Sequence, residues 1–161
     1  MTFISCNSRQ ENLEHMKPLT ANRDSITVPS FRIQLKLSEK AEKELNAKHE
    51  TVLVNVEFIG TPEKKVREKY KFEYYDENGQ VTLGKKTIEL TEAGEIEFDS
   101  CKISKGVLDL LKNKTYEVRI SSVSSRKSSK DNLLSCDFVQ LNIEKIKDKN
   151  IKINGKLIVE D

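Results

Sequence analysis

The segment T-V-L-V-N-V-E-F-I-G, residues Thr51–Gly60, determines the fold class of this chain. Its alternate positions divide into two faces. One face is apolar and contains Val52, Val54, Val56 and Phe58. The other face is mixed and contains Leu53, Asn55, Glu57 and Ile59. This period of two, rich in β-branched residues and closed by Gly60 and Pro62, predicts a β-strand. Because one face is mixed, we expect a central strand in a sheet whose outer side is partly solvated.

The composition is that of a single globular domain. The chain has 161 residues, which is enough to bury a sizeable core. Hydrophobic residues make up 36% and charged residues 34%, but the apolar residues fall in periodic runs, which argues against disorder. The 28 basic and 26 acidic residues leave a net charge of +2, too little for the electrostatic footprint of a nucleic-acid-binding protein. No apolar run reaches the roughly 18 residues of a membrane-spanning helix.

Further patterns on both sides of the opening segment extend the sheet. They predict strands at Ile26–Leu37 with a break near Pro29, at Val81 and Leu83, at Ile88 and Leu90, at Ile96 and Phe98, at Thr115–Val123, at Leu133–Phe138 and at Ile151–Val159. Ser38 predicts the cap of a short helix, and Lys105–Lys112 predicts another. Turn signals about every 8–12 residues predict an all-β fold. We expect an immunoglobulin-like or transthyretin-like sandwich of two sheets, with about seven or eight strands and one or two short helices.

Three segments bear on how the strands are connected. Alternation over Tyr70–Tyr75 predicts a strand that leads into a turn at Asp76–Gly79. Val139–Lys149 fits either a strand or a helical turn. In Ile151–Val159 the apolar residues keep one parity through Asn154-Gly155, so we expect one strand with a glycine bulge rather than a hairpin.

The N-terminal 25 residues are expected to be a lipoprotein-like segment and flexible tether, followed by a β-sandwich domain at residues 26–161. Asn7–Ser25 is polar and has no sustained period, as is typical of a linker. Before it, F-I-S-C at Phe3–Cys6 resembles the end of a bacterial lipoprotein signal, whose cysteine becomes acylated. Such a signal needs about 7–15 apolar residues before cleavage, and five residues precede Cys6. The alternatives are a gene start further upstream, or a chance motif with a thiol at Cys6 and a cytoplasmic location if Met1 is the true start.

The other two cysteines, Cys101 and Cys136, form the one remaining candidate constellation. They are 35 positions apart by subtraction. A disulfide between them would close a loop of that size and stabilise the fold by about 3–4 kcal/mol. The alternative is two buried thiols that pack as small hydrophobic groups. Acylation at Cys6 would favour the disulfide, because it leaves no odd thiol.

No sequence motif indicates catalysis, a cofactor or a metal site. The chain contains no G-x-S-x-G, P-loop, G-x-G-x-x-G or C-x-x-C motif. Its two histidines, His15 and His49, lie outside any ligand spacing. A carboxylate pair brought together by the fold would be invisible to this reasoning, so an enzyme with such a site stays an alternative.

Two charged loops are the candidate binding segments, because loops on a rigid scaffold usually carry recognition. The first is Thr61–Lys69, and the second is the polar segment Ser124–Asn132, which we expect to be flexible. The candidate side chains in them are Thr61, Lys64, Lys65, Arg67, Arg126, Lys127 and Lys130. A mixed charge run is also what an ordinary solvated loop contains.

Three runs together resemble a group of small bacterial envelope proteins without an assigned activity. They are L-S-E-K-A-E-K-E-L at Leu37–Leu45, E-T-V-L-V-N-V at Glu50–Val56, and S-S-R-K-S-S-K-D-N-L-L-S-C-D-F at Ser124–Phe138. The order of the first helix, the strand Val52–Phe58 and the strand Tyr116–Val123 is also similar to the outer-membrane lipoprotein of type VI secretion systems. That family joins an acylated N-terminal cysteine to a transthyretin-like sandwich with an added helix.

These observations lead to one expected function and its alternatives. We expect a non-enzymatic lipoprotein of the bacterial cell envelope, tethered through a lipid at Cys6 to the periplasmic face of the outer membrane. Its sandwich would bind a protein partner of the envelope or act as a structural module, with no cofactor and no nucleic acid. The alternatives are a soluble periplasmic module that binds a small ligand or carbohydrate, and a component of a type VI secretion-like assembly.

Overall fold

A computed structural model describes residues 24–69, 75–76, 78–99 and 101–159. Cys6, His15, residues 7–23 of the expected tether and residues 70–74 of the strand expected at Tyr70–Tyr75 lie outside the described residues, whereas Ser25 at the end of the expected tether belongs to β1. The strands are β1 (Ser25–Thr27), β2 (Phe31–Leu37), β3 (Val52–Gly60), β4 (Val81–Leu90), β5 (Gly94–Phe98), β6 (Lys102–Ser104), β7 (Glu117–Ser124), β8 (Leu134–Cys136), β9 (Val139–Asn142) and β10 (Asn150–Leu157). The helices are α1 (Glu39–Ala47), α2 (Lys64–Lys69) and α3 (Lys105–Leu108), with short 3₁₀ turns η4 (Lys112–Lys114) and η5 (Ile143–Lys145).

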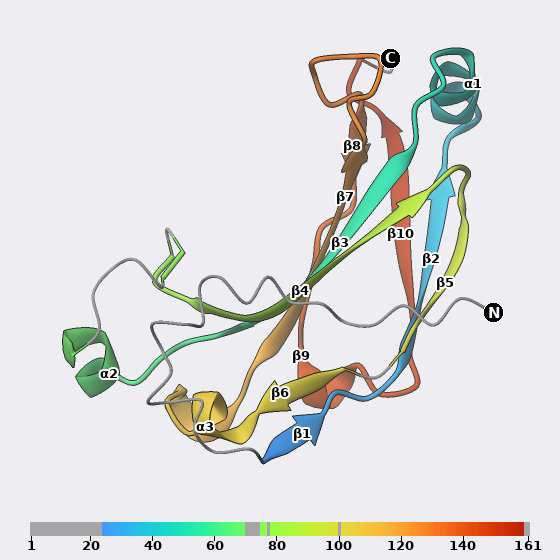
Figure 1. Cartoon of the computed structure of the whole chain (residues 1–161). Coiled ribbons are helices and arrows are strands. Elements are labelled where there is room, and N and C mark those ends of the chain that lie inside the picture. Colours follow the sequence, from blue (N-terminus) through green and yellow to red (C-terminus); the bar gives the residue numbers. More distant parts are fainter. Residues whose placement is uncertain (1–23, 70–74, 77, 100, 160–161) are drawn as a thin grey trace.

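The fold is an all-β sandwich, as the sequence predicts. Eight of the strands form two four-stranded sheets, with the orders β5-β2-β10-β8 and β4-β3-β7-β9. Strands β1 and β6 pair as a separate two-stranded sheet near one end of the molecule (Figure 1). The two large sheets account for the seven or eight strands expected, and the small sheet adds two short ones.

Strand β3 is the central strand that the opening segment predicts. It pairs antiparallel with β4 on one side and with β7 on the other. The apolar face of Val52, Val54, Val56 and Phe58 is buried, whereas Leu53, Asn55 and Glu57 on the other face are partly exposed. The two-faced pattern in the sequence is therefore the pattern of burial in the fold.

Aromatic contacts join the two sheets in the core. Phe98 of β5 stacks on Phe31 of β2, with ring centroids 4.7 Å apart, and meets Phe58 of β3 edge-on at 5.7 Å. Phe58 also meets Tyr116 edge-on at 6.3 Å. Because Phe98 and Phe58 belong to different sheets, this contact closes the sandwich, and edge-on geometry suits the charge distribution of the rings. Burial raises the pKa of Tyr116 to about 12, and a thiolate at Cys101 would add to that shift.

Strand β10 is a single strand, but it contains no bulge. It pairs in parallel with β2, in continuous register from Asn150 opposite Arg32 to Gly155 opposite Leu37. A Cβ atom at Gly155 would lie 2.7 Å from both the Cys136 Sγ atom and a Leu37 methyl carbon. The expectation of a bulge is thus wrong. The glycine is needed because neighbouring strands approach it closely, not because the backbone bends.

The helices only partly follow the expected boundaries. Helix α1 begins as predicted, with the Ser38 side chain accepting a hydrogen bond from the Ala41 amide at 3.2 Å. The second predicted helix is confined to α3, and the first candidate loop contains α2, which no periodicity indicated. Val66 is the buried residue that holds α2 against the domain. Among the described residues, no helix has the length and apolar character needed to cross a bilayer.

Two further connections differ from a simple reading of the sequence. Gly84 does not separate two strands, because β4 continues through it with a shift of register opposite Phe58 and Ile59. The segment from residue 139 to 149, for which the sequence allowed either a strand or a helical turn, contains both: first the strand β9 and then the helical turn η5. The turn at Asp76–Gly79 forms as predicted: the Asp76 carboxylate accepts hydrogen bonds from the Asn78 and Gln80 amides at 2.9 and 2.8 Å.

The prediction of a Cys101–Cys136 disulfide is wrong for this structure. Both side chains are thiols, Cys101 buried and Cys136 half-buried. Cys101 directly precedes β6 and Cys136 ends β8, and these strands lie at opposite ends of the molecule (Figure 1). Two sulfur atoms so placed cannot be bridged, because a disulfide requires Cα atoms within about 7 Å. The alternative interpretation, two thiols packed as small hydrophobic groups, describes both residues.

Candidate functional site

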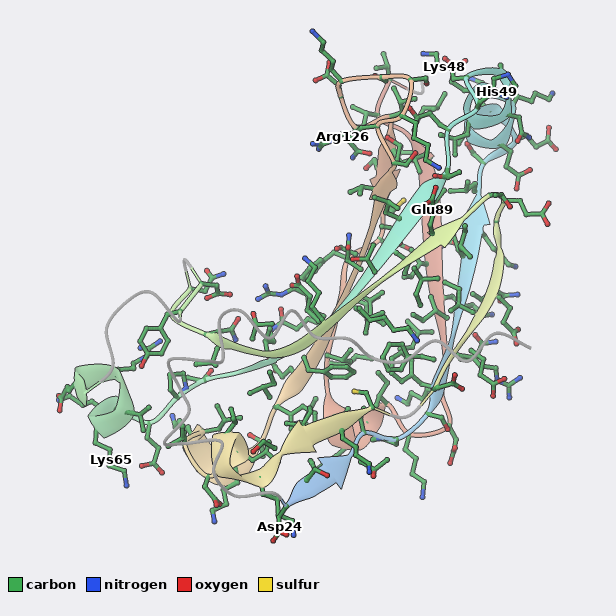
Figure 2. The ribbon with its side chains drawn as sticks, in the orientation of Figure 1. Asp24, Lys48, His49, Lys65, Glu89 and Arg126 are labelled. Atoms are coloured by element: carbon green, nitrogen blue, oxygen red, sulfur yellow. The ribbon has the colours of Figure 1, made fainter. Side chains whose placement is uncertain are left out.

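The two candidate loops lie far apart. Figure 2 shows Lys65, a residue of α2, at one extremity of the molecule, and Arg126 at another, the end that also holds Lys48 and His49 of the α1 region. The structure therefore does not combine the seven candidate side chains into one site. Each loop has to be judged by what surrounds it.

The loop after β7 is held by one buried carboxylate. Glu50, which lies two residues before the first residue of β3, is 3% exposed. Its two carboxylate oxygens accept hydrogen bonds from the Ser125 hydroxyl at 2.7 Å and from the amide and hydroxyl of Ser128 at 2.5 and 2.9 Å. The Ser129 amide adds a fourth at 3.1 Å. The loop is thus anchored through its serines, in contrast to the flexible segment that its composition predicts.

The hydrogen bonds determine the charge state of Glu50. Burial alone would raise its pKa, because it disfavours the ionised form. The bonds from the Ser125 side chain, from the amide and side chain of Ser128 and from the Lys127 amide outweigh burial and lower the pKa to about 2. Glu50 is therefore ionised at neutral pH and serves as an internal anion for the loop.

Other polar contacts complete this anchoring. The Lys127 ammonium group pairs with the Glu89 carboxylate, which also accepts a hydrogen bond from the Thr51 hydroxyl at 2.6 Å. The Asn132 side chain accepts a hydrogen bond from the Ser124 amide at 2.9 Å. Of the three candidate cations, Arg126 and Lys130 remain exposed without an ion pair among the described residues. Most polar groups of this loop thus serve the fold and are not available to a ligand.

The other candidate loop borders a hollow of about 600 Å³. Its lining comes from the segment around α2 and from η4, and consists of Thr61, Pro62, Glu63, Lys64, Lys65, Arg67, Lys112 and Asn113. We call this the cationic hollow. Two backbone contacts hold its sides together: the Lys112 amide donates to the Thr61 carbonyl at 2.8 Å, and the Glu63 amide donates to the Leu110 carbonyl at 3.0 Å. Four candidate residues, Thr61, Lys64, Lys65 and Arg67, therefore do meet in one place.

The charges of the cationic hollow are only partly compensated. Lys65 pairs with Glu63 at 2.9 Å, and Lys64 lies 3.9 Å from Glu68. Arg67 donates to the Gly79 carbonyl at 2.6 Å, which orders the side chain, and it forms no ion pair with the described residues. Lys112 has no ion pair within the part of the chain that the structure describes. Four cations and one carboxylate in the lining give a local charge of +3, by subtraction.

Sequence reasoning missed Lys112 and Asn113. Both belong to a turn in which Asn113 and Lys114 have positive φ values of 57° and 52°. Asn tolerates this left-handed region better than most residues, so the K-N-K triplet was a usable turn signal. Lys114 itself points to Asp109, 2.8 Å away, and its pKa is raised by that hydrogen bond and charge. The turn therefore presents Lys112 and Asn113 to the hollow.

A third polar cluster lies on the outer face of the β4-β3-β7-β9 sheet. Arg119 lies 3.7 Å from Glu57 and 3.6 Å from Asp76, and donates to the Gln80 side chain at 2.7 Å. Lys85 also pairs with Glu57, at 2.7 Å. Because both carboxylates are neutralised by cations, the cluster is an ion-pair network that fastens the Asp76 turn to the sheet.

The chemistry available at these sites is recognition by charge. Within the described residues, no group of three His, Cys, Asp or Glu side chains is arranged to hold a metal ion. Comparison with protein-family models, curated proteins and solved structures found no match to this chain. The fold and the site thus define the class directly: an all-β sandwich with a cationic hollow at one extremity.

Proposed function

We propose that this protein is a non-enzymatic binding module of the bacterial cell envelope, whose sandwich binds an acidic protein partner at the cationic hollow. A lipid at Cys6 would tether it to the periplasmic face of the outer membrane. The observation that supports binding at this place is the convergence of Lys64, Lys65, Arg67 and Lys112 around one hollow. In the other candidate loop, by contrast, polar groups are already bonded to Glu50 and Glu89.

The lining of the hollow favours a protein partner over a small apolar ligand. Small-molecule pockets are mostly apolar and aromatic with a few polar groups. Among the described residues that line the hollow, none is aromatic and Pro62 is the only apolar one. Exposed ammonium and guanidinium groups attract carboxylates over a distance, which accelerates and orients association. An acidic loop or helix end of a partner meets these requirements.

A charge-reversal experiment tests the binding proposal. Binding of a fluorescent Glu-rich peptide would be titrated for the wild type and for the Lys65→Glu/Lys112→Glu variant. The matched control is Lys40→Glu/Lys43→Glu, which reverses two exposed lysines of α1. We expect the hollow variant to weaken binding at least about tenfold, because each interfacial charge pair contributes on the order of 1 kcal/mol. Equal weakening by the control, or no peptide binding by the wild type at low salt, would refute the proposal.

A separate experiment tests the tether. Cells that express the gene with its natural upstream sequence would be labelled with a fatty-acid analogue, as wild type and as Cys6→Ala. We expect label in the wild type only. Label that persists in Cys6→Ala, or is missing from both, would contradict acylation at Cys6 and leave the binding proposal to be decided by the peptide titration.

A further inference from the structure

Six of the lysines that form no ion pair within the described residues lie in one part of the fold. Within the described residues, ion pairs engage Lys48, Lys64, Lys65, Lys85, Lys105, Lys114 and Lys127. In the segment from residue 144 to 156, by contrast, none of the five lysines forms such a pair; they are Lys145, Lys147, Lys149, Lys152 and Lys156. Lys36 of the neighbouring strand β2 is unpaired as well. We call these six residues the lysine face.

Sheet geometry places three of them on one side. Along β10, Ile151 and Ile153 are buried and the alternate residues Lys152 and Lys156 are exposed. Lys36 is exposed on β2 and lies opposite Asn154, an exposed residue of β10 that falls between these two lysines. The three ammonium groups therefore project from the outer face of the β5-β2-β10-β8 sheet. The other three lysines stand in the exposed segment that leads into β10.

The charge of this region exceeds that of the whole chain. The segment from residue 144 to 156 contains five lysines and two acidic residues, Glu144 and Asp148, and so has a net charge of +3. The whole chain has a net charge of +2, so all other residues together sum to −1. The outer face of this sheet also holds acidic residues: Glu95 on β5 pairs with Arg32 at 3.6 Å. The Asp137 carboxylate, next to β8, accepts hydrogen bonds from the amide and the side chain of Asn154 at 2.9 and 2.8 Å. One carboxylate, Asp137, therefore lies at Asn154 between Lys152 and Lys156, and the two lysines of β10 outnumber it.

We propose that the lysine face docks on an anionic phospholipid surface. The groups are separated ammonium ions on a pleated sheet face, which suits a plane of negative charge better than a single carboxylate. Lysines near such a surface attract it over about a Debye length without a defined hydrogen-bond geometry. Nucleic-acid binding would use aromatic or arginine stacking groups, whereas Arg32 on this outer face is paired with Glu95. The attraction does not depend on the lipid proposed at Cys6 or on the cationic hollow.

Docking can be measured with the unacylated full-length chain. The probe is a set of vesicles made of phosphatidylcholine alone or mixed with phosphatidylglycerol, and the readout is the partition coefficient from co-sedimentation. We expect binding to the mixed vesicles only, and loss of binding when salt is raised from about 0.1 M to 1 M. Substitution of Lys36, Lys152 and Lys156 by Gln should lower the partition coefficient about 100-fold, because each lysine contributes roughly fivefold.

Two controls make the result decisive. The triple variant Lys64→Gln/Lys65→Gln/Lys112→Gln removes the same charge from the cationic hollow and should change vesicle binding less than about tenfold. The lysine-face variant should keep its circular dichroism spectrum and its binding of the Glu-rich peptide, which shows that the fold and the hollow are intact. Equal loss in both triple variants, or binding to both kinds of vesicle, would overturn the proposal. The proposal would also be overturned if the wild type did not bind the mixed vesicles but bound an acidic protein through Lys152 and Lys156.

Discussion

The carboxylate of Glu50 accepts a hydrogen bond from the Ser125 hydroxyl at 2.7 Å, although 75 positions separate the two residues in the chain. Glu50 lies two residues before β3 and Ser125 directly follows β7, so the contact joins the start of one strand to the end of its neighbour. The Thr51 carbonyl reinforces this junction by accepting a hydrogen bond from the Ser125 amide at 2.9 Å. A single ionised side chain therefore closes one end of the sheet.

This junction makes stability depend on acid pH. The pKa of Glu50 is about 2 in the folded protein, against an ordinary value of 4.5. Because the folded pKa is the lower one, the stabilisation is present above pH 4.5 and is lost as the pH falls towards 2. The shift corresponds to at most about 3 kcal/mol. Chemical denaturation at several pH values should show that Glu50→Gln lowers the free energy of unfolding at pH 7 and reduces its decline between pH 5 and 2.

The matched control for this prediction is Glu92→Gln, an exposed carboxylate in the turn between β4 and β5. We expect it to leave both the stability and its pH dependence within about 0.5 kcal/mol of the wild type. An equal pH profile for the wild type and Glu50→Gln would contradict the role of Glu50.

Two serines on the same face of β7 should respond oppositely to removal of their hydroxyl groups. Ser122 is 5% exposed and its hydroxyl has no hydrogen-bond partner among the described residues. The Ser124 hydroxyl accepts from the Leu133 amide at 2.9 Å and donates to the Asn132 side chain at 3.2 Å. Ser122→Ala should raise the free energy of unfolding by up to about 1 kcal/mol, and Ser124→Ala should lower it by about 1–2 kcal/mol. Urea denaturation distinguishes the two, and a larger loss for Ser122→Ala would contradict this account.

Two glycines should differ in their tolerance of a methyl group. At Gly155 a Cβ atom would lie 2.7 Å from both the Cys136 Sγ atom and a Leu37 methyl carbon. At Gly94 no atom lies within 4 Å of a Cβ atom. Gly155→Ala should destabilise the fold by about 1–3 kcal/mol through overpacking, and Gly94→Ala should stabilise it slightly by restricting the unfolded chain. Cys136→Ala should recover part of the loss at Gly155 in a double-mutant cycle.

The thiols of Cys101 and Cys136 should be slow to react in the folded protein. Burial raises the pKa of Cys136 to about 11, and the charge of Asp137 contributes to the shift. Since the thiolate is the nucleophile, alkylation at pH 7.5 should be much slower in the native state than in urea. Mass spectrometry after alkylation in urea without reductant should find both residues modified. An unmodified, oxidised pair would contradict the structure.

Local sequence patterns were sufficient to predict the strands of the core. The period of two in β3, the parity of β10 and the Ser38 cap of α1 each depend on residues close together in the chain, so each could be recognised directly. The pairing partners of the strands could not be predicted from such local patterns. Nothing local to Phe31–Leu37 or to Asn150–Leu157 indicates that these strands lie side by side in parallel, because the contact arises only when both sheets pack.

The candidate site was only partly predictable for the same reason. Thr61, Lys64, Lys65 and Arg67 were identified because a charged loop follows the best strand. Lys112 is brought to them by an antiparallel β-bridge between Pro62 and Leu111. This contact could not be predicted because the two residues are far apart in the sequence. Glu50 was overlooked because a carboxylate before a strand looks solvated. Its serine partners were noticed only as a polar run, and their hydrogen bonds to Glu50 turn that run into an anchored loop.

The parallel pairing of β2 with β10 has a consequence for biosynthesis. Arg32 and Asn150 are opposite each other across 118 positions, by subtraction. Strand β2 therefore cannot complete its pairing until β10 has been translated and has left the exit tunnel of the ribosome. Of its two neighbours in the sheet, only β5 is synthesised before then. Contacts this distant also slow folding, because the intervening chain must be ordered first. The edge of β2 that pairs with β10 is thus exposed during most of the synthesis of the chain. A holdase chaperone would be expected to bind at this edge.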